Sequence, residues 1–170
     1  MGYRPPAFGY IHERKNGQLL FALEDDINSG AYNRNTYWYS ISFIDGHIRI
    51  KEMPFLSFQD GKIIKEQTQM VSGGLGNIRY HEKSDAMLVY GFLPFGMFPC
   101  NSVLTYSIAG DRFIFEKEEE KVACIGKKIE TPDDANAQFT EETDFNIRKV
   151  VKESTQSELK KMQEFDITKK

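Results

Sequence analysis

The chain has 170 residues, of which 40% are hydrophobic and 28% charged, with 22 basic and 25 acidic side chains and a formal net charge of −3. This length suits one domain with one core. The charges are nearly balanced and no basic run is longer than a pair, which argues against a nucleic-acid partner, because such a partner requires a basic patch.

The first residues and the cysteine content bear on the compartment. Residues 1–6 lack the apolar run of a secretory signal, and no stretch approaches the roughly 18 uninterrupted apolar residues of a membrane span. Two cysteines, Cys100 and Cys124, are too few for a scaffold built on disulfides. We therefore expect a cytoplasmic protein without membrane contact, provided that no signal peptide has been removed from it.

Along the chain, the strongest local signals are two-residue hairpin turns. Asn16-Gly17, Asp45-Gly46 and Asp60-Gly61 each lie between strand-like residues, and these residue types tolerate the positive φ of a type I′ turn. Gly110-Asp111 is a fourth pair in reversed order. The 13 Phe and 8 Tyr of the chain add to this pattern, because aromatic residues suit strands.

The turn at Asp45-Gly46 predicts a ribbon with one apolar and one polar face, because opposite residues of an antiparallel pair share a face. The apolar face carries Phe43 with Ile48, Ile41 with Ile50 and Tyr39 with Glu52, and the polar face carries Ser42 with Arg49 and Ser40 with Lys51. We expect an up-and-down meander over residues 36–70, with both Asp-Gly turns at the same end of one sheet. Its inward set is then Tyr39, Ile41, Phe43, Ile48, Ile50, Phe58 and Ile63.

The residues around the other turns predict less regular ribbons. Folding at Gly110-Asp111 pairs Ile108 with Phe113, Tyr106 with Phe115, and Thr105 with Glu116. Folding at Asn16-Gly17 and Asp60-Gly61 gives mixed faces, which indicates strands covered on both sides or a different register.

About eleven short strands can be placed between residues 8 and 125. They predict a mainly β fold: a single antiparallel barrel or sandwich of about ten strands, arranged as a meander over residues 1–126. The composition changes after Gly126, and residues 127–170 are expected to form a charged linker and a helical C-terminal tail that adds little to the core. Within this tail, Thr155 and Glu158 form a capping-box pattern before a short helix.

No motif identifies a catalytic, metal or cofactor site. Glu24-Asp25-Asp26 opens a loop after a strand, as a cation site would, but without the alternating oxygen ligands of a calcium loop. His12, His47 and His81 lie in different predicted strands, and no two have the close spacing of a structural zinc site. We therefore expect no bound metal and no cofactor, and we assign no catalytic residue.

The loop over residues 94–101 is the strongest functional signal. Most loops are polar because they cross the surface, whereas this one carries Phe95, Met97 and Phe98. These side chains either fold back as a core plug or lid, or they anchor a partner. Trp38, the single tryptophan, is a further candidate for contact with a partner or ligand.

Three functions from different classes follow. We favour a non-enzymatic protein-interaction module, such as an inhibitor or assembly subunit, which would use the apolar loop and the charged tail to bind another protein or a second copy of the chain. A barrel that encloses a small apolar ligand is the first alternative, because of the strand number and the phenylalanine content. The second is an enzyme whose site is assembled from several strands and therefore leaves no linear motif.

Overall fold

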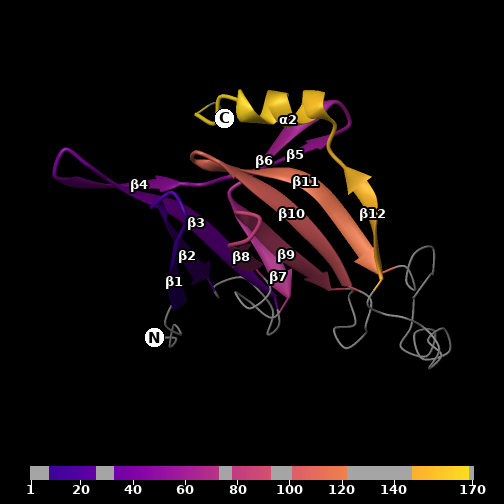
Figure 1. Ribbon diagram of the computed structural model, residues 1–170, viewed down its shortest axis with the longest axis horizontal. Helices are drawn as coiled ribbons and strands as arrows, with labels where there is room; N and C mark the ends of the chain where they lie inside the picture. Colours follow the sequence, from indigo (N-terminus) through magenta and orange to yellow (C-terminus); the bar gives the residue numbers. More distant parts are fainter. Residues whose placement is uncertain (1–7, 26–32, 73–77, 93–100, 122–146, 169–170) are drawn as a thin grey trace, which may run out of the picture.

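The computed structural model of the protein describes residues 8–25, 33–72, 78–92, 101–121 and 147–168. These residues form twelve strands and one helix (Figure 1), which confirms the prediction of a mainly β chain. The strands are β1 (Phe8–Glu13), β2 (Leu19–Asp25), β3 (Asn33–Ile44), β4 (His47–Glu52), β5 (Phe55–Gln59), β6 (Lys62–Glu66), β7 (Thr68–Ser72), β8 (Ile78–His81), β9 (Ala86–Phe92), β10 (Asn101–Ala109), β11 (Arg112–Lys121) and β12 (Arg148–Glu153). The helix of the described part, α2 (Gln156–Gln163), is too short and too polar to cross a lipid bilayer.

The strands build two sheets. The first has the order β1-β2-β3-β4, and β7 pairs with the N-terminal half of β3 on the side that β4 occupies further along. The second has the order β6-β5-β11-β10-β9-β8, and β12 pairs with β11 on the side of β5. The pairing of β5 with β11 is parallel, and the other pairs are antiparallel. Within the described residues neither sheet closes on itself, so the barrel that the sequence suggested is not found.

The chain passes from one sheet to the other at Met53 and Pro54. The Met53 N–H donates to the Trp38 carbonyl in the first sheet at 2.8 Å, and the Pro54 carbonyl accepts from the Phe113 N–H in the second at 2.9 Å. Pro54 has no N–H with which to continue the ladder along β3. The predicted single meander over residues 36–70 is therefore wrong, because the two Asp-Gly turns lie in different sheets.

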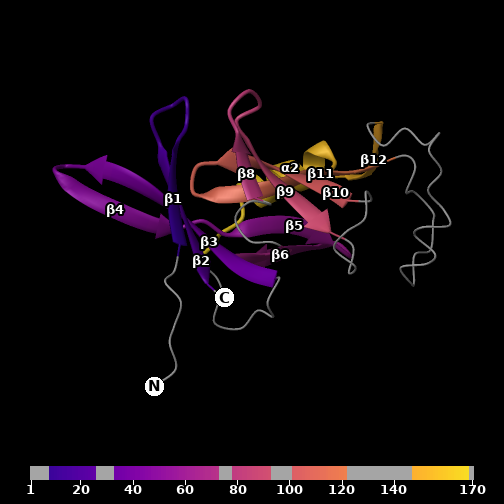
Figure 2. The same cartoon turned by 90° about the horizontal axis from the view of Figure 1, so that it is seen from below.

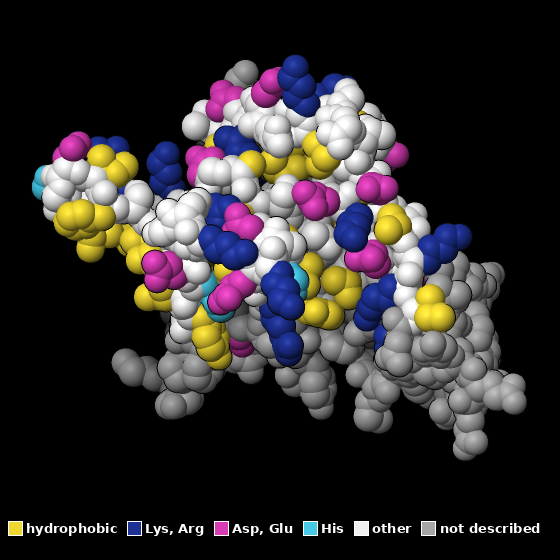
Figure 3. All heavy atoms as spheres, viewed as in Figure 1, with side chains coloured by type: hydrophobic (Ala, Val, Ile, Leu, Met, Phe, Trp, Pro, Cys, Tyr) yellow, Lys and Arg dark blue, Asp and Glu magenta, His cyan; other side chains and the backbone are white. Residues whose placement is uncertain are grey.

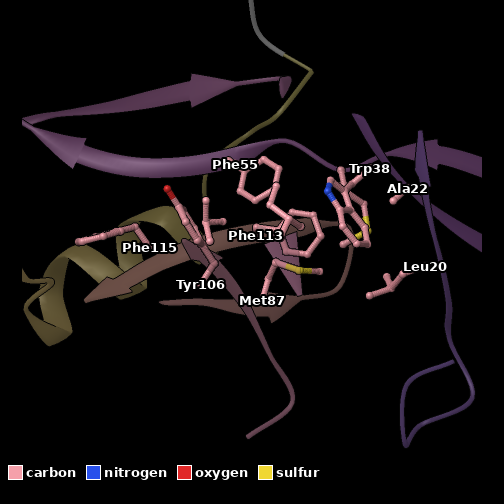
Figure 4. Packing of buried hydrophobic residues seen from close by; sticks show 11 residues of the cluster. Leu20, Ala22, Trp38, Phe55, Met87, Tyr106, Phe113 and Phe115 are labelled. Carbon is pink, nitrogen blue, oxygen red and sulfur yellow. The ribbon is translucent and has the colours of Figure 1, made fainter. Parts of the chain in front are cut away.

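The two sheets face each other across an aromatic core (Figure 4). The first sheet contributes Leu20, Ala22 and Trp38, and the second contributes Phe55, Met87, Tyr106, Phe113 and Phe115. The Phe55 ring stacks on Phe113 at 4.5 Å between centroids and meets Tyr106 edge-on at 5.1 Å. Aromatic pairs of this kind contribute about 0.5–1.5 kcal/mol beyond their buried area. Both sheets are therefore needed to complete this core.

The predicted registers around Asp45-Gly46 and Gly110-Asp111 are largely confirmed. The structure pairs Phe43 with Ile48, Ile41 with Ile50, Ile108 with Phe113 and Tyr106 with Phe115, as expected. A bulge between Thr105 and Tyr106 moves the partner of Thr105 from the expected glutamate to Lys117. At the first of these turns φ is 52° at the aspartate and 77° at the glycine, with the signs that a type I′ turn requires.

The first hairpin has a longer loop than the sequence indicated. The Arg14 N–H donates to the Gln18 carbonyl and the Gly17 N–H donates to the Arg14 carbonyl, both at 2.9 Å. With Gly17 at φ 82°, this is the three-residue loop in which a type I turn is followed by a left-handed residue. The longer loop shifts the pairing by one residue, so that Glu13 lies opposite Leu19. The pairing predicted for this hairpin was therefore in the wrong register, whereas the Asp60-Gly61 hairpin has the predicted one, with Phe58 opposite Ile63.

The predicted inward set is wrong for the whole β3–β4 ribbon. Tyr39, Ile41, Phe43, Ile48 and Ile50 share the face of the first sheet that points away from the core, because the buried residues of β3 are the alternate ones, such as Trp38 and Ser40. Phe43, Ile48 and Ile50 are exposed because the ribbon also extends beyond the second sheet (Figure 1, Figure 2). Phe58 and Ile63 are half-buried, but they pack in a different cluster beneath α2. The ribbon therefore has one apolar and one polar side, as predicted, but no core covers the apolar side in the part that the structure describes.

The C-terminal segment begins, in its described part, with a strand. β12 extends the second sheet, and its charges complement those of β11 in the pairs Glu118 with Lys152, Glu120 with Lys149 and Lys117 with Glu153. Opposite charges on neighbouring strands favour pairing. Residues 148–153 are therefore strand, where the sequence suggested helix.

α2 begins as the sequence predicts. The Thr155 hydroxyl accepts from the Glu158 N–H, and the Glu158 carboxylate accepts from the Thr155 N–H, which forms the capping box. Further along the helix, Met162 is fully buried in a cluster with Leu56 and Ile114. The expectation that the tail adds little to the core is wrong for this segment, and the expected boundary after residue 126 lies outside the described residues.

Candidate docking surface

The sequence suggested four contact residues, and the structure describes one of them. Three of them fall outside the described residues, namely Phe95, Met97 and Phe98. Trp38 lies in β3 and is 1% exposed, with its ring stacked on His12 and edge-on to Phe113, each at 5.9 Å between centroids. Among the described residues, its indole N–H is the one buried side-chain polar atom without a hydrogen-bond partner. Trp38 thus packs between the sheets, and a contact with a partner or ligand stays a prediction.

The histidines and the acidic cluster lie apart in the fold. His12 packs against the core, His47 is exposed at the end of the β3–β4 ribbon, and His81 Nδ1 lies 2.8 Å from the Ser84 hydroxyl. Glu24, the first residue of the acidic cluster, is buried in β2. In the part of the chain that the structure describes, no group of three or more His, Cys, Asp and Glu is placed to hold a metal ion.

One cluster of ionisable side chains joins the sheets at their loops. Arg14 donates from Nε and Nη2 to the two carboxylate oxygens of Asp85, at 3.0 and 2.6 Å, and the Tyr80 hydroxyl donates to the same carboxylate at 2.7 Å. Arg14 Nη1 donates to the Gln18 side chain, whose amide donates to the Gly110 carbonyl at 3.0 Å. These bonds tie the β1–β2 and β8–β9 loops, which lie side by side in Figure 2, to the β10–β11 turn.

The protonation states of this cluster fit a structural role. The hydrogen bonds from Arg14 hold the pKa of Asp85 below its usual range, and the same pairing raises the pKa of Arg14. Burial raises the pKa of Tyr80, and its hydrogen bond to Asp85 raises it further. The carboxylate is therefore ionised at neutral pH and both its oxygens are engaged, so it is not available as a base or nucleophile. We interpret this cluster as a clamp between the sheets.

The outer face of the first sheet carries a continuous apolar surface. Because paired residues share a face, the registers of β1 to β4 bring together Ile11, Leu19, Phe21, Leu23, Tyr37, Tyr39, Ile41, Phe43, Ile48 and Ile50, on the side away from Trp38. The rings of Phe21 and Tyr39 lie 6.1 Å apart on this face. A Cβ at Gly9 would lie 2.8 Å from the Phe21 ring, so glycine leaves the room that this ring occupies. We call these ten side chains the outer face.

The outer face continues onto the part of the ribbon that projects from the rest of the two sheets, which we call the body (Figure 1, Figure 2). We call residues 41–50 the hairpin arm. On its apolar side Phe43, Ile48 and Ile50 are 73%, 66% and 61% exposed. In Figure 3 hydrophobic side chains gather along the lower side of this ribbon. The arm therefore presents to solvent side chains of the kind that usually fill a core.

A groove lies at the base of the arm. It measures about 520 Å³ and is lined by Leu19, Ile41, Ser42, Phe43 and Ile48 together with Asn16, Gly17 and Gln18 of the β1–β2 loop. Sites for small molecules usually enclose most of the ligand surface, whereas this groove is only partly enclosed. Its mainly apolar lining suits an apolar segment of a larger partner.

The opposite side of the β3–β4 ribbon is mainly polar and basic, with Ile44 near its turn. Arg49 lies opposite Ser42 and Lys51 opposite Ser40, and both basic side chains are exposed. Lys51 Nζ lies 4.0 Å from an oxygen of Asp111, in an exposed ion pair of a kind that contributes little in water. Within the described residues β4 pairs with β3 alone, and all six of its residues are exposed. β4 thus presents an edge with one apolar and one basic side.

Sequence reasoning found the residues of the arm but placed them in the core. Apolar alternation is the same for a strand that faces a core and for one that faces a future partner. The sequence of β4 contains one signal that distinguishes the two kinds of strand. Its polar face carries Arg49 and Lys51, and basic residues of this kind are typical of edge strands.

Comparisons of the chain with protein-family models, with curated proteins and with solved structures found no match. The functional argument therefore depends on the geometry of this chain alone.

Proposed function

We propose that this protein is a non-enzymatic protein-interaction module that docks through the outer face and the hairpin arm. The observation that carries the proposal is the exposure of Phe43, Ile48 and Ile50 on an ordered ribbon that projects from the body. A partner protein that covers these side chains removes apolar surface from water, which is the main favourable contribution to association.

The size of the apolar surface supports a specific interface. Phe43, Ile48, Ile50 and Ile11 alone present on the order of 500 Å² to solvent. The half-buried side chains between them, such as Phe21 and Tyr39, add to this area. A standard interface buries about 800 Å² on each partner, so the outer face and the arm together suffice for one.

The ribbon geometry gives a second reason. Past Ile41 and Ile50 the arm consists, within the described residues, of two strands only. A two-stranded ribbon is marginally stable in water unless a third strand or a helix covers its apolar side. A bound partner would supply that cover and stabilise the arm.

The apolar loop and the charged tail have different places in this proposal. Phe95, Met97 and Phe98 remain candidates for a second contact with the same partner. The described part of the tail is engaged in packing instead, through β12 on the second sheet and Met162 in its cluster. The clamp of Arg14, Asp85 and Tyr80 favours a non-enzymatic role, because its polar atoms already bond one another.

Photo-crosslinking in cells tests the proposal. A photoreactive phenylalanine analogue is placed at Phe43, and in a matched variant at Lys83, which is exposed in the β8–β9 turn on a different part of the molecule. The expected result is a protein adduct specific to position 43 that forms again with the purified partner and is lost after Ile48→Asp. Equal crosslinking at both positions would contradict the proposal.

A further inference from the structure

We infer that β4 accepts an added β-strand from the partner protein, and that the strand it accepts alternates apolar with acidic residues. This inference rests on the proposed function and specifies the chemistry of the partner. It follows from the position of β4 at the edge of its sheet and from its apolar and basic side chains. The same features argue against a second copy of the chain and against a lipid surface at this edge.

β4 has the geometry of an acceptor edge. It ends the first sheet, pairs with β3 over residues 47–52 and pairs with no other strand of the described part. All six of its residues are exposed, so its second edge is open to solvent. Backbone N–H and C=O groups on such an edge pair readily with an extended segment, and this pairing supplies affinity without regard to sequence.

The side chains of β4 supply the specificity. Residues directly opposite each other on neighbouring strands share a face. An added strand therefore places one set of its side chains beside Ile48 and Ile50, on the apolar side of the arm, and the alternate set beside Arg49 and Lys51. Apolar residues match the first set and carboxylates match the second, which gives a partner segment with a period of two.

A second copy of the chain does not match this edge. The one antiparallel register of two β4 strands that pairs both isoleucines, with Ile48 opposite Ile50, places Arg49 opposite Arg49 of the other copy. A parallel pairing in register places Arg49 beside Arg49. Like charges directly opposite each other destabilise a sheet in either arrangement. The basic side chains therefore act against self-pairing and favour an acidic strand.

A lipid surface is also disfavoured, although apolar and basic residues together often indicate one. An apolar ribbon that enters hydrocarbon must have all of its backbone groups paired, because an unpaired group there costs several kcal/mol. The open edge of β4 does not meet this condition. A strand from another protein pairs the same groups and covers the apolar side at once.

Peptide titration of the full chain provides the first test. Two capped probes are used, one of alternating valine and glutamate and one of alternating valine and lysine, each six residues long, with binding followed by the backbone amide signals of His47–Glu52 in NMR spectra. We expect the acidic probe to bind at β4 at least about fivefold more tightly than the basic probe, with a preference that shrinks as salt rises. Equal affinities, or no binding of either probe, would overturn the inference and would leave Arg49 and Lys51 as residues that merely protect an edge strand.

Charge reversal provides the second test. Arg49→Glu with Lys51→Glu is expected to reverse the preference, so that the basic probe binds more tightly than the acidic one. The matched control is Lys62→Glu with Lys83→Glu, which makes the same change in net charge at exposed positions elsewhere and is expected to leave the preference unaltered. A control that also reverses the preference would show a long-range charge effect and overturn pairing at β4.

Further measurements separate this inference from the proposed function. If charge reversal leaves both probes unchanged while Ile48→Asp still abolishes the crosslinked partner, strand addition fails and the docking surface stands. If neither variant has an effect, both fail. Self-association in sedimentation that Arg49→Glu abolishes, or binding of vesicles rich in phosphatidylserine at the β4 amides, would also overturn the acidic strand as the occupant.

Discussion

Asp85 lies at φ 49°, in the left-handed region that aspartate and asparagine tolerate better than most residues. Its position follows from its contacts, because its carboxylate accepts hydrogen bonds from Arg14 and Tyr80 at the point where the loops of the two sheets meet. Arg14 is the more deeply buried partner, with 6% of its side chain exposed against 40% for Asp85. The stabilising effect of this pair therefore depends mainly on keeping the buried guanidinium matched.

Asp85→Asn tests the clamp. Asparagine keeps the size of the side chain and its tolerance of positive φ, but it leaves the guanidinium of Arg14 without its counter-charge. We expect the free energy of unfolding at pH 7 to fall by about 1–3 kcal/mol, toward the lower end because Asp85 is partly screened by solvent. Urea unfolding measures this value. An unchanged midpoint would show that the loops are held by other contacts.

The same pair predicts a pH dependence with a definite sign. The pKa of Asp85 is lowered by Arg14, so its contribution is complete above the unfolded carboxyl pKa of about 3.9 and is lost as the pH falls through the lower folded value. The variant Asp85→Asn lacks this contribution at every pH. Urea unfolding of both proteins should therefore show a difference that is constant from pH 5 to 7 and closes below about pH 4. A difference independent of pH would contradict the ion-pair explanation.

At the scale of elements, α2 depends on its position over the second sheet. The helix has eight residues, a length that is not stable alone in water. Its capping box fixes the start, and Arg112 donates from Nη1 to the carbonyls of Gln163 and Phe165 at its end. Lys65 Nζ adds a bond to the Ile167 carbonyl at 3.0 Å. The bonds from Arg112 and Lys65 therefore hold the C-terminal end of the helix on β11 and β6, with Met162 facing inward.

Met162→Ala tests whether this segment is part of the folded core. The side chain is fully buried in its cluster with Leu56 and Ile114, so its removal should lower the free energy of unfolding by about 2–5 kcal/mol. The matched control Lys160→Ala changes an exposed residue of the same helix and should have an effect below about 0.5 kcal/mol. Calorimetric unfolding would show both values. Equal and small effects would mean that the tail is dispensable, as the sequence suggested.

Particular elements show what sequence patterns can predict here. Asp45-Gly46 and Gly110-Asp111 fixed the local register, because turn geometry and alternation act within a few residues. The crossing at Met53 and Pro54 was not foreseen, because a strand that ends at proline has the same pattern whether the chain continues in its own sheet or enters another. The pairing of β12 with β11 was also missed, since it depends on contacts between residues that lie far apart in sequence.

The candidate site was misassigned for a related reason. Ile48 and Ile50 have the sequence pattern of core residues, but this pattern does not state which face of a sheet the other sheet covers, or how far a ribbon extends beyond it. The length of β3, twelve residues, exceeds the span that the second sheet covers, and this excess creates the hairpin arm. The exposed surface was therefore predictable in composition and not in position.

At the scale of the whole molecule, the body and the arm have separable roles. The core lies between the sheets and contains no residue of the arm. The connection to the second sheet starts at the base of the ribbon, where the Met53 N–H bonds the Trp38 carbonyl. Shortening the arm should therefore affect binding and leave the folding of the body intact.

Replacing Phe43–Ile48 by Asn-Gly tests this separation. The new turn directly follows Ser42 and precedes Arg49, which are already a pair, so the remaining register is preserved. We expect the free energy of unfolding to change by less than about 1 kcal/mol, because only exposed side chains are lost. Because Phe43 is deleted, the photoreactive residue is placed at Ile11 on the remaining outer face, and its adduct with the partner should disappear. Loss of cooperative unfolding would show that the arm supports the core.

The single tryptophan of the chain lies on the same strand as the arm but on the buried side of the sheet. Its fluorescence therefore provides an internal optical signal for the body. Emission from a fully enclosed indole is shifted to short wavelengths, and it moves toward the red only when the two sheets separate and water reaches the ring. Variants of the hairpin arm should keep the native spectrum even where they no longer bind a partner, whereas Asp85→Asn should bring the spectral change to lower urea concentrations. Tryptophan fluorescence thus distinguishes variants in which the two sheets separate more easily from variants that alter only the hairpin arm.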